Sequence, residues 1–259
     1  MYLLAVDVGN TNIVMGVYRD DKLQHHWRIH TDREKFMDEY GELFDSFLEK
    51  KGIKNRDINQ VAISNVVPSL QSLFENLSAN HFNCTPFFIN HKNKLNFEIR
   101  IENPAELGAD LIAAASSSIE FYGVPSITLD LGTATTFTVV NKNRELLGGV
   151  IAPGLNISQK ALYSQAPHLP VVKLENPPSV IGNTTEYALQ AGLFTGYLHM
   201  IKGLIADIKQ VIGSDAVVIA TGGLAQVIRN SDSIFDVLNS HLVLDGIRFI
   251  YNLNKKTAG

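Results

Sequence analysis

The sequence lacks two features that mark whole classes of protein. Cys84 is its only cysteine, so a single chain has neither an internal disulfide framework nor a thiolate zinc cage. No apolar run approaches the roughly 20 residues that a membrane-spanning helix needs. The opening segment 1–10 reaches the charged Asp7 too early for a signal peptide and predicts a strand. We therefore expect a cytoplasmic protein with no membrane partner.

Clustered charge of one sign is also missing. The chain has 22 Lys and Arg against 26 Asp and Glu, for a formal net charge of -4, and the basic residues are scattered. Such a balance provides no long-range attraction for a phosphate backbone or for anionic lipid. We therefore expect no nucleic-acid partner.

Several short catalytic motifs are absent. Neither G-x-x-x-x-G-K-[ST] nor G-x-G-x-x-G occurs, which excludes a Walker-type phosphate loop and a dinucleotide fingerprint. No serine lies in a G-x-S-x-G elbow, and the eight histidines show no H-E-x-x-H spacing. Serine hydrolysis and a histidine-held metal are not expected.

The chain does have the length and apolar content for two domains. It contains 259 residues, of which 45% are hydrophobic. Helical periodicity is found over 34–51, 69–79, 104–121 and 184–212, with strand-like runs between these ranges. Alternating strands and helices predict mixed α/β layers. The helical pattern breaks at Gly123-Val124-Pro125, so we expect one domain over 1–118 and a second over 119–259.

An internal repeat supports this division. Residues 7–23 (DVGNTNIVMGVYRDDKL) and 130–146 (DLGTATTFTVVNKNREL) align with Asp, Gly and the final Leu in register. Each copy follows an apolar run and continues through a second strand into a polar turn. A further echo aligns 61–64 with 217–220, and each of these strands runs through a turn into a helix. The sequence predicts that each half opens with a β-hairpin.

The two Asp-x-Gly turns are candidate phosphate sites. Gly9 and Gly132 allow backbone N–H groups to approach an anion closely. Neutral donors follow them, namely Asn10, Thr11, Thr133, Thr135 and Thr136. The carboxylates of Asp7 and Asp130 belong beside phosphates only if cations separate the like charges. This predicts Mg²⁺ and a second, monovalent ion; the alternative is that each Asp-Gly pair simply forms a turn.

Two other segments have both a functional and a structural interpretation. The Gly pair of 220–223 follows a buried strand, where it either allows a base or sugar to approach the backbone or forms a plain turn. Asp110 lies in a small, apolar helix beside Gly108. Its carboxylate either takes a proton from an attacking hydroxyl or stabilises the positive end of the helix dipole, as Glu106 does.

These motifs together resemble a known superfamily. Segments 7–12, 130–136 and 220–223 look like the first phosphate, second phosphate and adenosine motifs of the acetate and sugar kinase, Hsp70 and actin superfamily. Within it, the chain resembles the type III pantothenate kinases almost from end to end. The more specific matches are SNVVP at 64–68, NPAELGAD at 103–110, GGVIAPG at 148–154, IGNTT at 181–185 and QAG at 190–192.

The resemblance implies a fold and an activity. The fold would be α/β, with two ribonuclease H-like domains and a nucleotide cleft between them. The activity would be transfer of the γ-phosphate of ATP to the primary alcohol of pantothenate, the first step towards coenzyme A. It would require Mg²⁺ and a monovalent cation, K⁺ or NH₄⁺, and a homodimer would form the pantothenate pocket.

The resemblance also implies roles for individual residues. Asp110 would be the general base, and the pantothenate site would include Gly108, Ala109, Asp110, Leu111 and, from the partner chain, Thr185. ATP would be bound by Asp7, Val8, Gly9, Asn10, Thr11, Asn12, Ile13, Val14, Thr133, Gly222 and Gly223. Asp7 would hold Mg²⁺ through the phosphates, and Asp130 would bind the monovalent cation.

One position departs from the family pattern. Family members usually have Arg directly after the Gly-Ala-Asp run, where it can pair with the pantothenate carboxylate, but this chain has Leu111. We expect a working kinase in which Arg100, Arg28 or His168 serves that carboxylate. The alternative is a catalytically impaired nucleotide-binding homologue with a regulatory role. A polymerising or chaperone ATPase is disfavoured because the chain lacks room for the extra subdomains of such proteins.

Overall fold

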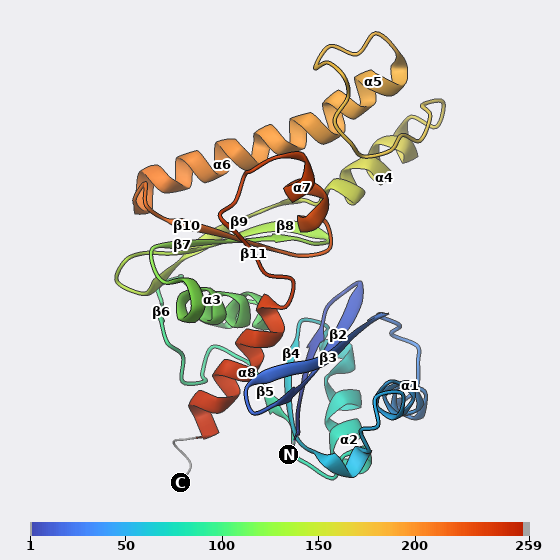
Figure 1. Ribbon diagram of the computed structural model, residues 1–259, viewed down its shortest axis with the longest axis vertical. Helices are drawn as coiled ribbons and strands as arrows, with labels where there is room; N and C mark the ends of the chain where they lie inside the picture. The colour runs from blue at the N-terminus through green and yellow to red at the C-terminus, as the bar shows by residue number, and fades with distance from the viewer. Residues whose placement is uncertain (1, 256–259) are drawn as a thin grey trace. The chain divides into compact units, whose positions relative to one another are not determined.

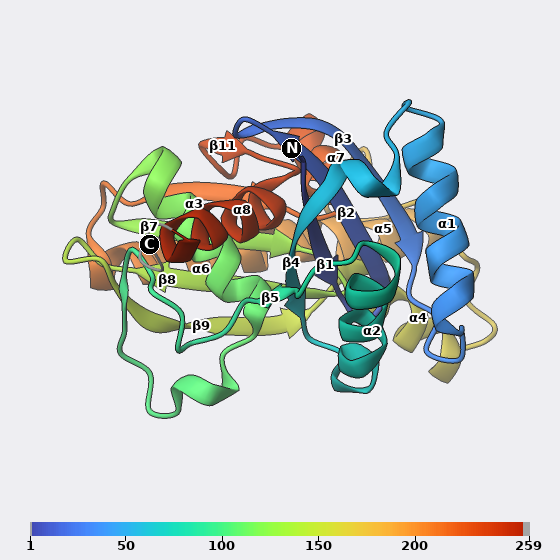
Figure 2. The ribbon, with the colours of Figure 1, turned by 90° about the horizontal axis from the view of Figure 1, so that it is seen from below.

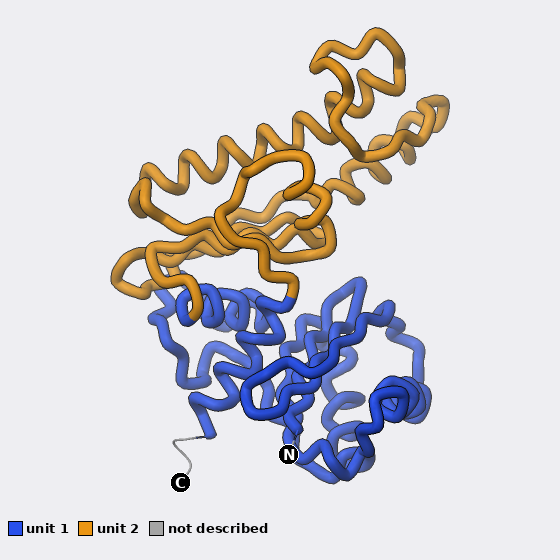
Figure 3. Tube along the Cα trace, viewed as in Figure 1, with its two compact units in different colours: residues 1–120, 241–259 blue, residues 121–240 orange. Residues whose placement is uncertain are grey.

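The computed structural model describes residues 2–255. The chain divides into two compact units (Figure 3): unit 1 contains residues 1–120 and 241–259, and unit 2 contains residues 121–240. The first crossing lies close to the boundary expected at 118/119. The C-terminal segment, which we expected in the second domain, clusters instead with unit 1.

Unit 1 is built on a mixed sheet in the order β3-β2-β1-β4-β5. The strands of this sheet are β1 (Tyr2–Val8), β2 (Asn12–Arg19), β3 (Lys22–His30), β4 (Ile58–Asn65) and β5 (Phe87–Phe88); the short β6 (Glu98–Ile99) is not part of it. Its helices are α1 (Met37–Glu49), α2 (Gln71–His81), α3 (Ala109–Tyr122) and α8 (Leu242–Lys255), with 3₁₀ turns η1 (Asn55–Asp57), η2 (Pro68–Leu70) and η3 (Pro104–Glu106). The helices predicted over 34–51, 69–79 and 104–121 are confirmed as α1, α2 and α3.

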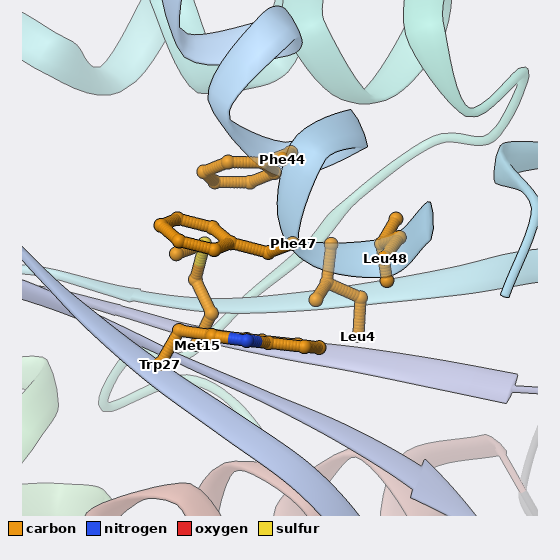
Figure 4. A pocket seen from close by; sticks show the side chains of 6 residues that line it. All are labelled: Leu4, Met15, Trp27, Phe44, Phe47 and Leu48. Carbon is orange, nitrogen blue, oxygen red and sulfur yellow. The ribbon is translucent and has the colours of Figure 1, made fainter. Parts of the chain in front are cut away.

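The two faces of this sheet have different coverings (Figures 1 and 2). Alternate residues such as Val6 and Ile63 join an apolar core with α1 and α2. A small apolar hollow in this core (Figure 4) is lined by Leu4, Met15, Trp27, Phe44, Phe47 and Leu48. Trp27 stacks on Phe47 with ring centroids 5.7 Å apart, so its role is packing.

Helix α8 covers the opposite face and explains why the C-terminus belongs to unit 1. A Cβ added at Gly16 of β2 would lie 3.0 Å from Leu244 of α8. Tyr18 Oη donates to Asp245 Oδ1 (2.9 Å), and Arg248 Nη1 donates to Asp21 Oδ1 (2.6 Å). Both bonds join α8 to the β2–β3 hairpin. None of the predicted helical ranges included α8.

Unit 2 contains five strands in the order β11-β10-β7-β8-β9. They are β7 (Ser126–Leu131), β8 (Ala134–Val140), β9 (Glu145–Pro153), β10 (Val217–Thr221) and β11 (Val237–Leu238). The helices are α4 (Leu155–Gln165), α5 (Thr185–Gln190), the π-helical η4 (Ala191–Thr195), α6 (Gly196–Ile212) and α7 (Ala225–Ser231). Helix α6 packs Leu198, Ile201 and Ile205 on one face of the sheet (Figure 1). The helix predicted over 184–212 is confirmed as α5, η4 and α6 in succession.

The predicted repeat is a three-stranded meander that occurs once in each unit. β1 pairs antiparallel with β2 and parallel with β4, and β7 has the same relations to β8 and β10. Strands β2 and β8 share the same order of buried and half-buried positions over their first seven residues. Each meander also has a register irregularity at the equivalent point, Val17/Tyr18 and Val139/Val140.

The strand pairing corrects the second echo by one residue. Asp7 lies opposite Ser64 on β4, and Asp130 lies opposite Thr221 on β10. The counterpart of Ser64 is therefore Thr221, whereas comparison of the apolar runs aligned it with Ala220. Two valine-rich runs can be aligned in either register, and only the pairing with the neighbouring strand fixes it.

No helix within residues 2–255 is long and apolar enough to cross a membrane.

Candidate functional site

The β1–β2 turn of unit 1 is held by the segment that follows β3. Gly9 N–H donates to Asn12 O (3.0 Å), and Thr31 N–H donates to Thr11 O (2.9 Å). The Thr31 hydroxyl also donates to Gly9 O (2.6 Å). These bonds fix the turn and leave Asn10 exposed at its tip.

Arg33 is a cation at this turn that sequence reasoning missed. Its Nη2 donates to Asn10 Oδ1 (2.8 Å), and both side chains are exposed. A guanidinium has further donors suited to phosphate oxygens. No motif identifies Arg33, because its position depends on the lengths of β2 and β3, which bring residues 31–33 back to the turn.

Not every predicted ATP-binding residue can use its side chain. Val8 and Ile13 are fully buried in the core of unit 1, so only their backbone groups remain for a ligand. Gly9, Asn10, Thr11, Asn12 and Val14 are exposed or half-buried. The expectation for side-chain contacts from Asp7 to Val14 therefore narrows to Asp7, the turn residues and Val14, with backbone groups alone at Val8 and Ile13.

The β7–β8 turn of unit 2 is one residue shorter. Seven positions separate Asp7 from its partner Val14, but six separate Asp130 from its partner Thr136. Gly132 N–H donates to Ala134 O (3.1 Å), and Thr133 is exposed at the tip. After this shorter turn, β8 is offset by one residue from the ungapped alignment of the two repeats. The side chains of β8 that face inward therefore differ from those that the alignment implies.

One predicted phosphate donor is excluded by this shift. Thr135 is fully buried, and its Oγ1 lies 2.5 Å from the hydroxyl of Tyr197 on α6. The prediction that Thr135 supplies a donor to an anion is therefore wrong, because its hydroxyl is used inside unit 2. Thr133 and Thr136, exposed and half-buried respectively, remain accessible.

The 220–223 segment lies beside Asp130. Gly222 has φ +93°, and a Cβ there would meet the carboxylate of Asp130 and lie 2.6 Å from the backbone of Leu131. Leu224 N–H donates to Leu131 O (3.1 Å). Gly222 is thus required by packing within unit 2, while Gly223 is exposed. Segments 130–136 and 220–223 are therefore neighbours in unit 2.

The oxygen donors at both turns suit hard cations. Asp7 and Asp130 are each the next-to-last residue of a buried strand, and in each the Oδ1 atom is buried. No group of three His, Cys, Asp or Glu side chains in residues 2–255 is placed to hold a metal ion. Mg²⁺ is typically held by one or two carboxylates together with substrate phosphates. The Asp7 carboxylate, next to the β1–β2 turn that contains Asn10 and Thr11, fits that kind of site.

Asp110 lies at the same edge of unit 1 as Asp7. It occupies the first turn of α3, and its Oδ1 accepts a hydrogen bond from Leu111 N–H (2.8 Å). A Cβ added at Gly108 would lie 2.5 Å from that Oδ1 and 3.6 Å from Val66 Cγ1. Val66 follows β4 and donates its N–H to Val8 O (3.0 Å). The carboxyl ends of β1 and β4 therefore lie next to Asp110.

The environment of Asp110 favours a base over a helix-dipole role. Burial raises the pKa of this carboxyl, and the hydrogen bond from Leu111 N–H opposes the shift. A carboxylate that only stabilised the helix dipole would contribute most at an exposed position, where its ionised form costs little free energy. Glu106 is exposed in η3 and accepts from Asn103 Nδ2 (2.7 Å), and its helix-dipole role stays a prediction.

The structure places the other expected substrate residues as follows. Ala109 is buried, and Leu111 is half-buried beside Asp110. Arg100 is ion-paired with Glu98 (2.8 Å), while Arg28 on β3 and His168 after α4 are exposed. Thr185 is exposed at the start of α5, next to the helix cap in which Thr184 Oγ1 accepts from Tyr187 N–H (3.2 Å).

Exposed apolar side chains gather around α4, α5 and the segment between them. This part of unit 2 extends beyond the end of its sheet (Figure 1). The exposed residues are Ile157, Val171, Val180, Ile181 and Tyr187, and Ile151 is exposed on β9, which directly precedes α4. Thr185 belongs to the same region. Exposed apolar side chains in this number are typical of a surface that contacts a partner.

Comparison of the whole chain with known proteins agrees with these motifs. The family model for type III pantothenate kinase matches residues 3–207. A type III pantothenate kinase from Halalkalibacterium halodurans is 42% identical over 252 residues, which cover 97% of this chain and 99% of that protein.

Solved structures agree on the fold. A Campylobacter jejuni protein described as a Baf family transcriptional activator has TM-score 0.60 and 25% identity, covering 98% of this chain and 99% of its own. A ROK family glucokinase from Streptomyces griseus, solved with glucose and AMPPNP, has TM-score 0.51 and 13% identity, covering 99% of this chain and 100% of its own. With the duplicated meander, these likenesses confirm two ribonuclease H-like halves. The family model and the identity to its members over nearly the full chain show that the chain belongs to the type III pantothenate kinase family.

Proposed function

We propose that this protein phosphorylates pantothenate with ATP to give 4′-phosphopantothenate, the first step of coenzyme A synthesis. Membership of the family over nearly the full chain supports the reaction. The observation that carries the proposal is Asp110, a carboxylate with a pKa raised by burial at the same sheet edge as Asp7. Gly108 leaves the space that the Asp110 carboxylate occupies.

In the proposed reaction, the primary hydroxyl of pantothenate attacks the γ-phosphorus of ATP. The new P–O bond forms as the bond to the β-phosphate oxygen breaks, and ADP leaves. Asp110 accepts the hydroxyl proton; its raised pKa makes it a stronger base than an exposed aspartate. Gly108, Ala109 and Leu111 border this base and contact pantothenate.

Both glycine turns bind ATP in this proposal. In unit 1 the binding groups are Asp7, Asn10, Thr11, Asn12 and Val14 with the backbone at Val8, Gly9 and Ile13, together with Arg33. In unit 2 they are Thr133, Gly222 and Gly223, with Asp130 binding K⁺ or NH₄⁺. The chemistry that Mg²⁺ supplies at Asp7 is neutralisation of phosphate charge during transfer.

We also propose a homodimer through the α4–α5 region. Its exposed apolar side chains would be covered by a second copy, and this contact would bring the exposed Thr185 to the partner's pantothenate site. Sedimentation of the purified chain tests this. A dimer that becomes a monomer in Ile181→Asp supports the interface, and a monomeric wild type overturns it.

The test of the activity is direct. Purified protein is incubated with Mg-ATP, K⁺ and pantothenate, and phosphopantothenate is measured by mass spectrometry. Product formation that is lost in Asp110→Asn is the expected result. ATP binding without product at millimolar pantothenate would instead support the regulatory homologue, which Leu111 alone favours.

A further inference from the structure

Ser64 has a buried hydroxyl that finds no hydrogen-bond partner in the described part of the chain. It is the next-to-last residue of β4, before Asn65, and is 0% exposed. Within residues 2–255, its Oγ makes no hydrogen bond. Buried side-chain polar atoms nearly always have a partner, and the exceptions frequently have a functional explanation. A buried hydroxyl without a hydrogen bond costs free energy of folding, and alanine would fill nearly the same space without that cost. The presence of the hydroxyl therefore needs an explanation.

The position of Ser64 supplies that reason. Ser64 lies directly opposite Asp7 in the parallel pairing of β4 with β1. Adjacent strands lie about 4.8 Å apart, and paired residues project to the same face. Their neighbours Val6 and Ile63 project into the core with α1 and α2, so Asp7 and Ser64 share the opposite face. The hydroxyl is therefore a donor beside a carboxylate whose Oδ1 is also buried.

The same arrangement occurs in the other unit. Thr221 lies opposite Asp130 in the parallel pairing of β10 with β7, and it is 3% exposed. A hydroxyl beside the aspartate that comes next to last in the first strand is thus present in both copies. The strands around it differ in sequence, since Ala62-Ile63 corresponds to Ile219-Ala220. The hydroxyl residue is present beside the aspartate in both copies although the residues before it differ. This repetition indicates that the neighbouring aspartate is the reason for the hydroxyl.

Ser126 provides a contrast. Its Oγ is likewise buried without a partner within residues 2–255. It lies at the start of β7, opposite Val217 and Val140, at the far end of the strand from Asp130. It has the burial of Ser64 without a neighbouring carboxylate in its pairs, and is therefore a matched control.

We propose that Ser64 is a positioning residue for Asp7: its hydroxyl donates to the Asp7 carboxylate when that carboxylate binds the Mg²⁺-nucleotide. A charge-assisted bond would hold the carboxylate in the orientation that the cation requires. The inference rests on the proposed role of Asp7. It assigns to Ser64 a part in nucleotide binding that does not extend to pantothenate.

The test compares Ser64→Ala with Ser126→Ala in the full chain. Both variants remove a buried, unpartnered hydroxyl, so both should melt at or above the wild-type temperature without ligand. Only Ser64→Ala should raise the Mg²⁺ concentration that half-saturates AMPPNP binding, by about tenfold in calorimetric titrations. The KM for pantothenate at saturating Mg-ATP should stay within twofold, a split that general loss of structure would not give.

Asp7→Asn separates the two levels of the proposal. If Asp7→Asn binds AMPPNP with the wild-type Mg²⁺ dependence, the proposed role of Asp7 fails. If Asp7→Asn loses that dependence while Ser64→Ala behaves like Ser126→Ala, the role of Asp7 stands and the inference about Ser64 is overturned.

Discussion

The two meanders, β1–β2–β3 and β7–β8–β9, share a backbone plan but differ where a ligand would meet them. In each, the first strand has an aspartate as its next-to-last residue, opposite a hydroxyl residue of the parallel neighbouring strand. The β1–β2 turn is held by side-chain and backbone bonds from Thr31 and carries the exposed Asn10 and Arg33. In the β7–β8 turn, a Cβ added at Gly154 would meet the carbonyl of Thr133 and lie 2.7 Å from that of Gly132.

This difference shows how one fold can be used twice. The turn in unit 1 has amide and guanidinium groups exposed and has Asp110 at the same sheet edge, so it has groups suited to chemistry on a phosphate. The turn in unit 2 is packed closely by its own chain at Gly154 and Gly222, and Thr133 is its exposed side chain at the tip. We expect substitutions in unit 1 to change turnover and substrate affinity, and those in unit 2 to change stability and nucleotide affinity.

The largest expected effect is that of Asp110→Asn. Loss of the general base should lower kcat by about 10³-fold, because a positioned base contributes 10²–10⁴-fold. AMPPNP affinity should remain unchanged, since the two turns are intact. Steady-state kinetics and calorimetry check this. If Asp110→Asn kept more than a tenth of the wild-type kcat, unit 1 would not be the unit in which substitutions change turnover.

The pKa of Asp110 gives the same variant a signature in pH. Since burial raises the pKa above 3.8, the acid limb of kcat/KM should lie above that value and follow one ionisation. The ionised carboxylate is disfavoured in the folded state, so its contribution to stability falls as pH rises through the folded pKa. Asp110→Asn should therefore melt at a higher temperature than wild type near pH 7, and a lower melting temperature would contradict the assignment.

Gly222→Ala tests the packing of the turn in unit 2. The positive φ alone should cost about 1–3 kcal/mol of unfolding free energy, and the clash with Asp130 and Leu131 adds to it. Urea unfolding measures the loss. Gly203→Ala is the matched control, because Gly203 is exposed within α6 with open space around it and should gain about 0.5–1 kcal/mol. Equal stabilities for the two variants would show that the turn is not packed as described.

Leu111→Arg introduces, beside Asp110, the arginine that the family resemblance implies at this position. A guanidinium paired with the pantothenate carboxylate should lower KM for pantothenate by about tenfold or more, since hydrogen bonds to charged groups contribute about 1.5–3 kcal/mol. kcat should change little, because such binding is uniform between ground and transition state. Leu111→Met should match wild type. An unchanged KM would mean that another group already serves the carboxylate.

The smallest effect is expected from Arg33→Ala. Arg33 is exposed, so its attraction for phosphate is screened. KM for ATP should rise about fivefold, with kcat within twofold and with a smaller effect at high salt. Arg33→Lys should retain part of the affinity. Equal KM values for ATP in wild type and Arg33→Ala would restrict nucleotide contacts in unit 1 to the turn itself.

Much of this architecture could be predicted from periodicity and repetition. The apolar spacing gave α1, α2, α3 and the run from α5 to α6, because amphipathic helices leave a local pattern. The one-residue difference between the turns could not be predicted, because Asp, Gly and Leu align without a gap at both ends of the repeat. The register that pairs Thr221 with Asp130, and the fold-back that brings Arg33 to Asn10, depend on contacts between distant residues.

The C-terminal helix teaches the same lesson at larger scale. Its sequence follows unit 2 directly, so order along the chain placed it in the second domain. Ser117 Oγ donates to Leu242 O (2.6 Å), and Gly246 packs against the backbone of Ala113. These contacts with α3 place α8 in unit 1. These contacts could not be predicted from the order of the chain, because the only sequence feature that marks the close packing of the two helices is one glycine, Gly246.

The most direct test of this account is calorimetric titration of Mg-AMPPNP into wild type, Asp7→Asn and Asp130→Asn. If both meanders serve one nucleotide, the wild type should bind one molecule per chain, and each variant should weaken that single binding event at least tenfold. A wild type with two independent nucleotide sites, or affinity that is unchanged by one of the two substitutions, would contradict the central claim.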